Sequence, residues 1–458
     1  MKKVITGLFL VIFLLVNTAQ AEVLKAVIVA PDEEVKLTFP EALQKALELN
    51  HQLNAAKYDV LSQEKRIGVQ KSNFYPQLNF GQDFVWLNTP ADVFGLTLNQ
   101  RRLTAAAFAG APGTFNNPAP LTNFLSNVSL QQTLFSRKDI INLRIAKNDY
   151  TAKNFELRRT EETVAMEVSK AYLMAKTAAE YVKVAQQAVL DSREHLRLAT
   201  VRYNNQVGLY SDVLRTQTAL KKAEQNLVSA EKNYMVAKKG LGLTIGINKL
   251  VDVDNIVPLI EVSEYKDYKD NYTNRADINA VEMNYKNAEN AVKLAKSAYF
   301  PELKAGGNYS VYSKSAPFGY DGNYFQLYGM FKWNIFDGKR KRKELDIAKF
   351  ELGKAGEYLA GQKEKAQFEI FEAYKTVEEK AKNLEYAQVS MDSAQEGMRL
   401  IEVRYKNSLS PVLDLLDAQL NLDQTRAELI KSRNEYVFSV LNLSYASGTI
   451  LEDLGLKN

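Results

Sequence analysis

Apolar residues recur with a seven-residue period along two long segments without proline, residues 137–203 and 338–405. At about 1.5 Å per residue, each would form a helix about 100 Å long. A strict heptad repeat indicates left-handed coiled-coil packing. Returning heptad segments complete two predicted helical hairpins, at about residues 137–245 and 338–450. The second seam shows the pattern: Ala366, Ile370, Ala373, Val377, Leu384, Ala387, Met391, Ala394, Met398 and Ile401.

Alternating apolar and polar residues mark four shorter segments, two ahead of each hairpin. One face is rich in aromatic residues, as in Phe80, Phe84 and Trp86. Runs of roughly ten residues with this alternation are typical of transmembrane β-strands. A half-buried strand of a soluble sheet alternates in the same way, so the pattern alone leaves both interpretations open. The expected strands are at about residues 77–87, 121–135, 302–313 and 323–336.

Aperiodic segments separate these elements. Residues 22–36 form an expected leader, and residues 88–120 and 313–322 are expected loops because they are rich in turn-forming residues. Each hairpin follows a polar residue suited to a helix N-cap, Ser136 in one case and Asp337 in the other. Ahead of the strands, helices are predicted from Thr38 to Tyr75, with a break near Asn50, and from Arg275 to Phe300.

The whole arrangement occurs twice because the chain contains an internal duplication. Val201-Arg202-Tyr203 returns as Val403-Arg404-Tyr405, and many further matches keep the same offset of 202 positions. Such self-similarity identifies two copies of one structural unit. We therefore expect two repeats, residues 22–250 and 275–458. Residues 251–274 link them and are expected to lie around the outside of the hairpins.

The N-terminus has the pattern of a secretory signal peptide. Lys2 and Lys3 precede the apolar run Val4–Val16, and Ala19-Gln20-Ala21 predicts cleavage after Ala21. A transmembrane anchor is the less favoured alternative, because the run is shorter than the ~20 residues that a span needs. No later run is long and apolar enough for a transmembrane helix, so a membrane span would have to use strands.

The composition argues against an enzyme or a nucleic-acid-binding protein. The 59 basic and 54 acidic residues are interspersed and leave a formal net charge of only +5. The chain has no cysteine, and we find no phosphate-binding loop, nucleophile motif or metal-ligand spacing. No catalytic residue, cofactor or metal is therefore expected. The only two histidines, His51 and His195, are expected to be solvated or to have packing roles.

Four strands cannot close a barrel, and lipid does not tolerate open strand edges. Several copies would therefore have to share one barrel. Two copies would give eight strands and a filled interior. Three copies would give twelve strands and a lumen, and the long hairpins favour this larger ring.

The order of helix, strand pair and long hairpin, repeated once, resembles the TolC-like outer membrane efflux proteins over essentially the whole mature chain. The carrying motifs are Tyr75-Pro76 and Phe300-Pro301 before the strands, Phe336-Asp337-Gly338 before the second hairpin, and Val207-Gly208-Leu209 in the first turn. The resemblance implies a homotrimer with a 12-strand barrel in outer-membrane lipid and a 12-helix α-barrel through the periplasm. It also implies an inner-membrane pump, joined through a periplasmic adaptor protein.

The resemblance points to a gate at the hairpin tips of the second repeat. Asp414 and Asp417 lie three residues apart on one helix face and match aspartates that line the periplasmic constriction of such proteins. In a trimer they would form two acidic rings that favour cations. Tyr405 matches a tyrosine that holds the tip closed, and Ser211 and Asp212 match its partners. The family often has an arginine at the position of Ser410, which leaves that part of the closed-state network open.

The turns themselves are the expected docking surface for the adaptor. They comprise Gly208, Leu209 and Tyr210 in the first repeat and Ser408 and Leu409 in the second. Apolar residues at exposed turns indicate a binding surface, although leucines can also simply close their hairpins.

The sequence thus predicts a passive outer-membrane exit duct of an efflux pump or a type I secretion system. The rival hypothesis is a coiled-coil scaffold or surface structural protein without a pore. Neither the cargo nor the particular pump and adaptor can be identified from these residues.

Overall fold

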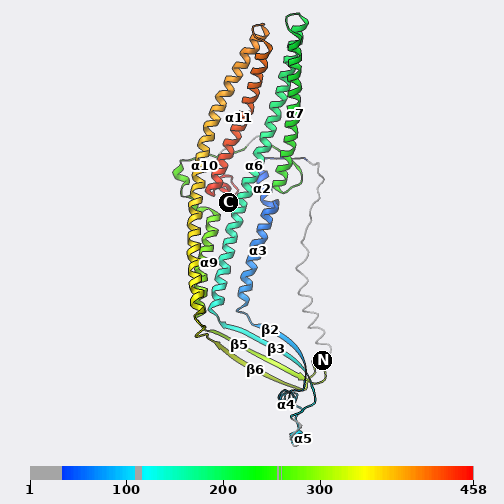
Figure 1. Ribbon diagram of the computed structural model, residues 1–458, viewed down its shortest axis with the longest axis vertical. Coiled ribbons are helices and arrows are strands. Elements are labelled where there is room, and N and C mark those ends of the chain that lie inside the picture. Colours follow the sequence, from blue (N-terminus) through cyan, green and yellow to red (C-terminus); the bar gives the residue numbers. More distant parts are fainter. Residues whose placement is uncertain (1–33, 109–115, 255–256, 259, 457–458) are drawn as a thin grey trace.

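The computed structural model describes residues 34–108, 116–254, 257–258 and 260–456, which form a long shaft of helices with a β-sheet at one end (Figure 1). The expected mainly α fold with a small β part is confirmed. The predicted signal peptide, residues 1–21, lies outside the described residues. Within the described ranges, none of the helices combines the length and the apolar character that crossing a membrane would require.

Two antiparallel helical hairpins form the shaft. Their seams bury the small and apolar residues of the heptads, including Ala366, Ile370 and Ala373. The first helix of each hairpin extends far beyond its partner, and shorter helices pack beside this extension. The helices of the shaft are α2 (Phe39–Leu49), α3 (His51–Ser72), α6 (Arg137–Asn204), α7 (Tyr210–Ile245), α9 (Ala276–Ser297), α10 (Arg340–Lys406) and α11 (Val412–Ser447).

The two hairpins begin differently. At α6 the hydroxyl group of Ser136 accepts a hydrogen bond from the amide of Asp139 at 3.2 Å, as an N-cap should. The expectation that Asp337 is the N-cap of α10 is wrong, because Lys339 occupies that position with a φ of 72°. The Asp337 carboxylate still accepts from the amide of Lys341 at 3.1 Å and so satisfies a free N–H of the first turn.

Midway along the shaft, a belt of short elements from the start of the chain, the link between the repeats and the end of the chain packs against the outside of the hairpins. Tyr172 of α6 is fully buried there against Phe39, with the two rings 5.2 Å apart and edge to face. Its hydroxyl group donates to the carbonyl of Leu37, so it fixes the short sheet to the shaft. The elements of this belt are β1 (Glu34–Leu37), which pairs in parallel with β4 (Leu250–Val253), and α8 (Tyr265–Tyr268), η1 (Asn271–Asn274) and α12 (Ile450–Asp453).

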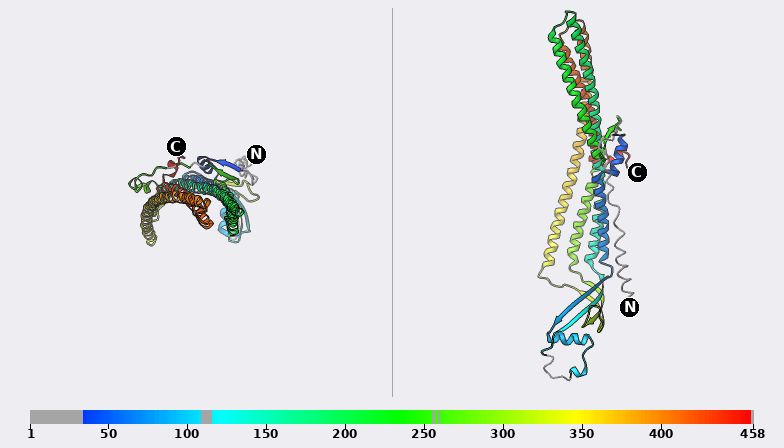
Figure 2. Two further views of the ribbon diagram at one scale, coloured as in Figure 1. Left: turned by 90° about the horizontal axis from the view of Figure 1, so that it is seen from above. Right: turned by 90° about the vertical axis from the view of Figure 1, so that its right-hand side faces the viewer.

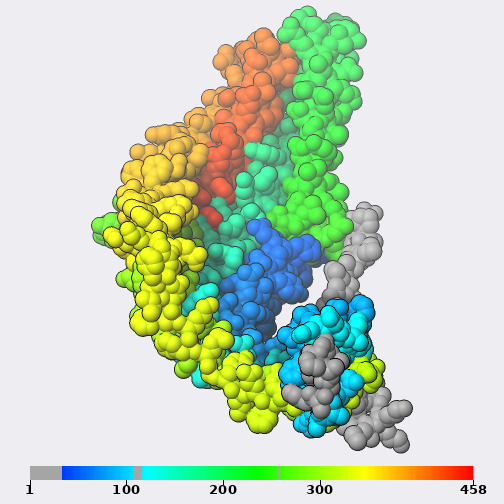
Figure 3. Space-filling view, turned by 60° about the horizontal axis from the view of Figure 1, so that its bottom comes forward, coloured from blue at the N-terminus to red at the C-terminus, as the bar shows by residue number. Residues whose placement is uncertain are grey.

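The shaft is curved in cross-section. Seen from above, the helices form an arc, and the belt lies on its convex side (left view of Figure 2). The space-filling view shows the same wall from its sheet end, with α10 along one flank and α7 along the other (Figure 3). The helices therefore form a curved wall, and no other described element covers its concave face.

The large sheet is antiparallel throughout, in the order β2-β3-β5-β6. Its register places the apolar positions on one face, for example Phe80 opposite Val128, Val128 opposite Tyr309, and Tyr309 opposite Phe325. This face is exposed: Phe325 retains 77% and Leu327 80% of their accessible surface. The strands are β2 (Gln77–Leu87), β3 (Leu121–Phe135), β5 (Glu302–Ser313) and β6 (Gly322–Lys332).

Three expectations about the ends of the elements need correction. The last strand ends at Lys332 rather than near residue 336, because Lys332 pairs with the first residue of β5 and no strand lies opposite beyond it. Residues 88–120 are not only a loop, since Thr89 followed by Pro90 starts a helix. The segment contains α4 (Pro90–Asn99) and α5 (Ala105–Phe108), and the expected leader ends in β1.

Candidate functional site at the hairpin tips

Both hairpins turn through the same backbone structure. Gln206 and Ser408, which match in the internal repeat, adopt left-handed φ values of 63° and 62°. In each turn the next residue donates its N–H to the carbonyl of an arginine: Val207 to Arg202 at 3.0 Å and Leu409 to Arg404 at 2.8 Å. These bonds close the helix ends in the manner of a Schellman motif.

The side chains of the two turns differ although their backbones agree. A Cβ at Gly208 would meet the Cβ of Arg202 at 3.0 Å and the amide of Tyr203 at 3.1 Å, so a side chain there would crowd the end of α6. The matching residue of the second repeat, Ser410, is buried, and its hydroxyl group donates to the carboxylate of Asp414 at 2.8 Å. Ser410 thus orients the carboxylate of Asp414.

Asp414 and Asp417 are both exposed and flank Leu415, which is fully buried in the seam. Asp414 lies in the first turn of α11, where the positive end of the helix dipole stabilises a carboxylate. The second hairpin therefore presents two carboxylates to solvent, one held by a hydrogen bond and the other three residues further along the same helix. This is the arrangement that an acidic ring would need in an oligomer.

Tyr405 connects the two hairpins within one chain. Its side chain is only 2% exposed and packs among the seam residues of α10 and α11. The guanidinium group of Arg202, from α6, lies over its ring at 4.6 Å from the centroid and also donates to its backbone carbonyl. Burial raises the pKa of the Tyr405 hydroxyl group, and the nearby charge of Asp212 raises it further, against the opposing effect of Arg202.

Ser211 and Asp212, the other predicted gate residues, lie in the first turn of α7. Ser211 is exposed and Asp212 is partly buried. The structure brings Asp212 into electrostatic range of Tyr405 but makes Arg202 the residue that touches the tyrosine. Sequence reasoning treated Arg202 only as a marker of the repeat. The available signal was that Arg202 matches Arg404 in the internal repeat, directly before Tyr203 and Tyr405.

A second connection, also missed, lies nearer the middle of the hairpins between α6 and α11. His195 is buried, and its Nε2 is 3.2 Å from the Oε1 of Gln419. The amide nitrogen of Gln419 donates to Asp423 at 3.0 Å and to Asp191 at 3.3 Å, and Arg426 faces both carboxylates. Burial raises the pKa of the Asp423 carboxyl group. The i, i+4 spacing of polar residues within an apolar seam could have identified this contact.

The expected docking residues lie at the outer end of the tips. Leu209 and Leu409 each retain 68% of their accessible surface, and Tyr210 is also exposed, with its ring 5.4 Å from that of Tyr203. Ser408 is exposed as well, whereas Gly208 is half-buried. The leucines therefore do not close their hairpins, and they are available to another molecule.

Comparisons with known proteins match this architecture. The family model described as "Outer membrane efflux protein" matches residues 42–246 and 268–449. Nodulation protein T of Rhizobium leguminosarum bv. trifolii is 26% identical over 179 residues, which cover 38% of this chain and 38% of that protein. Outer membrane protein TolC of Salmonella enteritidis is 19% identical over 433 residues, 90% of this chain and 82% of TolC. A crystal structure of CusC superimposes with a TM-score of 0.74 at 15% identity, over 91% of both chains.

The fold and these matches identify the protein as an outer membrane channel protein and not as an enzyme. The chain belongs to the outer membrane efflux protein family, whose model covers both repeats.

Proposed function

We propose that three copies of this chain form a passive exit duct across the outer membrane of a Gram-negative bacterium, after removal of a signal peptide at Ala21. The two repeats, residues 22–250 and 275–458, would each supply one strand pair and one hairpin. Three chains then give twelve strands and twelve helices around one lumen. The match of both repeats to the family described as "Outer membrane efflux protein" supports this role.

The observation that carries the proposal is the isolated four-stranded sheet. Strands β2 and β6 are its two edges, and each has no further strand within the described chain. The apolar face of the sheet is uncovered over its whole width, with Phe80, Leu130 and Leu327 exposed. In a soluble protein, other elements would cover such a face. In a membrane, lipid can cover it, but the edge strands must then be paired because lipid cannot satisfy their backbone hydrogen bonds. Neighbouring copies and outer-membrane lipid satisfy both requirements together.

The tips would act as the gate. In the closed state, Arg202 and Tyr405 hold the two hairpins of one chain together, and the carboxylates of Asp414 and Asp417 surround a narrow throat. A periplasmic adaptor protein that docks on Leu209 and Leu409 would separate the hairpins. Energy would come from an inner-membrane pump, in either a tripartite efflux system or a type I secretion system.

Single-channel recording tests this proposal against its rival, a coiled-coil scaffold without a pore. Purified protein in planar bilayers should give small, cation-selective currents. The exposed apolar sheet face favours the duct, because a scaffold has no use for it. Absence of any current from protein shown to be trimeric and folded would refute the duct.

A further inference from the structure

Basic residues are concentrated where the helices of the shaft meet the large sheet (Figure 1). Five of them are consecutive, at residues 339–343 where α10 begins. The strand ends and helix starts at this level carry nine basic and four acidic residues, a net charge of +5 that equals the net charge of the entire chain. We call this set the basic collar. Its members are Arg137, Lys138, Asp139, Glu302, Lys304, Lys332, Asp337, Lys339, Arg340, Lys341, Arg342, Lys343 and Glu344.

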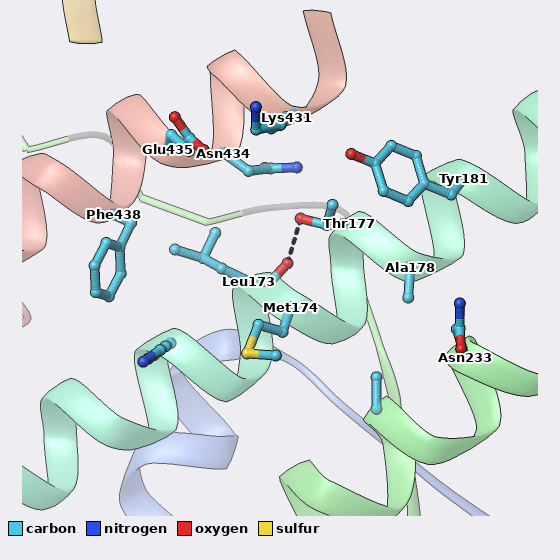
Figure 4. A pocket seen from close by; sticks show the side chains of 12 residues that line it. Leu173, Met174, Thr177, Ala178, Tyr181, Asn233, Lys431, Asn434, Glu435 and Phe438 are labelled. Atoms are coloured by element: carbon cyan, nitrogen blue, oxygen red, sulfur yellow. Dashed lines mark hydrogen bonds between the residues drawn. The ribbon is translucent and has the colours of Figure 1, made fainter. Parts of the chain in front are cut away.

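Charge is balanced in other parts of the molecule. The half of the sheet far from the shaft, with its connecting segments, carries three basic and three acidic residues. They are Arg101, Arg102, Lys314, Asp83, Asp92 and Asp321. On the shaft the two signs are mixed, as in the hollow between α6, α7 and α11, where Lys431 lies one helical turn from Glu435 (Figure 4). The basic collar is therefore a local accumulation of charge and not a property of the whole surface.

Folding of the hairpin does not require this accumulation. The matching helix of the first repeat, α6, starts with Ser136 as its N-cap and Asp139 in its first turn, whereas α10 has no acidic residue in its first turn. Cations are unfavourable near the N-terminal, positive end of a helix dipole. Residues 339–343 therefore weaken the start of α10, apart from the one amide that Asp337 satisfies.

The chain supplies few charges that could offset the basic run. Glu344 pairs with Arg340 at 3.2 Å, and both side chains are exposed. Lys339, Arg342 and Lys343 are also exposed and make no ion pair within the part of the chain that the structure describes. Three neighbouring cations are thus left to solvent or to another molecule.

A neighbouring chain of the proposed trimer would not neutralise them. The neighbour that pairs with β6 would do so through its β2, and α3 leads into β2. The last two turns of α3, residues 66–72, contain two basic residues and no acidic one. Assembly would therefore add positive charge at this level.

Exposed apolar residues connect the sheet to the basic collar. Trp333, Ile335 and Phe336 follow the last residue of β6 and are 52%, 80% and 80% exposed. The indole N–H of Trp333 donates to the carbonyl of Tyr299 at 3.1 Å, which fixes the ring at the end of the sheet. Tryptophan is enriched at the boundary between lipid chains and headgroups. The basic run begins three residues after Phe336, where headgroup phosphates would lie if the sheet is in lipid.

We propose that the basic collar binds the anionic headgroups of phospholipids in the periplasmic leaflet of the outer membrane. The proposal rests on the proposed duct, which places the sheet in lipid and the shaft in the periplasm. Clusters of Lys and Arg directly beside a membrane-spanning segment attract anionic lipids. Headgroup phosphates would offset the repulsion among residues 339–343, while acyl chains cover Trp333 and Ile335. The bound lipids would fix the depth at which the duct sits in the membrane.

The two tryptophans of the chain can report on this surface separately. Trp86→Phe leaves Trp333 beside the basic collar, whereas Trp333→Phe leaves Trp86, which is exposed near the far and charge-balanced end of β2. Each variant is reconstituted into vesicles of phosphatidylcholine and phosphatidylglycerol, in which one of the two lipids carries brominated acyl chains. Bromine quenches tryptophan fluorescence on contact, so the quenching gives the relative affinity of the two lipids at each position. Trp333 should prefer phosphatidylglycerol by about fivefold or more, the factor that one Lys or Arg supplies near an anionic surface. Trp86 should show no preference.

Charge substitutions then test the residues themselves. Lys339→Gln, Arg342→Gln and Lys343→Gln together should abolish the preference at Trp333. The control, Lys221→Gln, Lys222→Gln and Lys232→Gln, removes the same charge from exposed positions of α7, far from the sheet (Figure 1), and should retain the preference.

The outcomes separate this inference from the duct. Equal lipid preference at the two tryptophans, or a preference that survives substitution of the three collar residues, would overturn the lipid surface. Quenching at both tryptophans without any preference would refute the lipid surface alone. Absence of quenching at both would show that the sheet is not in lipid, and would refute the duct as well.

Discussion

The contact between Arg202 and Tyr405 makes a quantitative prediction for gating. Arg202→Met keeps an unbranched apolar chain over the ring but removes the guanidinium group. It therefore removes both the interaction with the ring at 4.6 Å and the hydrogen bond to the carbonyl of Tyr405. Both interactions join α6 to α10, so their loss should favour the state in which the hairpins separate.

The size of the effect follows from the two interactions. A cation over an aromatic ring contributes about 0.5–1 kcal/mol when exposed and about 2 kcal/mol when desolvated. A hydrogen bond to a charged donor contributes about 1.5–3 kcal/mol. Because Arg202 is partly exposed, the lower values apply and the sum is about 2 kcal/mol per chain. Since about 1.4 kcal/mol is tenfold, the equilibrium between closed and separated tips should shift by about 30-fold.

Single-channel recording in planar bilayers measures this shift as an increase in open probability and conductance. The internal repeat provides the control: Arg404→Met alters the matching residue of the second hairpin, whose side chain is exposed. It should leave the open probability close to that of the parent protein. If the two variants open equally, or if Arg202→Met stays closed, Arg202 does not hold the gate.

Three further predictions concern the gate, the inter-hairpin contact and the belt. Asp414→Asn combined with Asp417→Asn should weaken cation selectivity, measured as a smaller reversal potential in a salt gradient; an unchanged potential would remove these residues from the pore. Because burial raises the pKa of Asp423 above its ordinary ~3.9, the folded protein binds this proton more tightly than the unfolded chain. Its contribution to stability should be present at low pH and decline as the pH rises from about 4 through the raised value. The measurement is hydrogen exchange of the α11 amides, corrected for intrinsic exchange rates, as a function of pH. Asp423→Asn should make the protection of these amides depend less on pH, and the same pH dependence in variant and parent would contradict the prediction. Arg275 is 4% exposed and contacts the carboxylates of Asp277 and Glu369 at 2.7 Å. Arg275→Met should lower the free energy of unfolding by about 3 kcal/mol. An unaltered denaturation midpoint would show that these two ion pairs do not stabilise the fold.

The elements that could be predicted are those whose residues carry a long period. Heptads that continue through helices of 68 and 67 residues specify each helix with great redundancy, so α6 and α10 have the expected extents. Strand β6 was predicted to continue to residue 336 because Trp333 and Ile335 continue the alternation. The strand ends where its pairing partner ends. Glu302 is the first residue of β5 and pairs with Lys332, so β6 has no partner after Lys332.

Contacts between the hairpins could not be predicted from periodicity, because they join positions that are 203 and 224 residues apart in the chain. His195 illustrates the difference. A lone histidine on a helix is compatible with solvent or core, and only the structure shows it buried against Gln419. The same holds for β1, whose four residues, Glu34–Leu37, are too few to display a period and form a strand because β4 lies beside them.

In the proposed duct, the two tips would form a gate with less symmetry than the wall. The backbone of both turns is the same, down to the left-handed residues Gln206 and Ser408. Two positions further along, the first turn packs Gly208 closely against Arg202, whereas the second uses Ser410 to hold Asp414. In the proposed trimer, backbone equivalence would allow six hairpins to close one tube at nearly equal spacing. Because the side chains differ, only three of the six would bring a held carboxylate to the throat, so loss of Ser410 should disturb the gate without disturbing the wall.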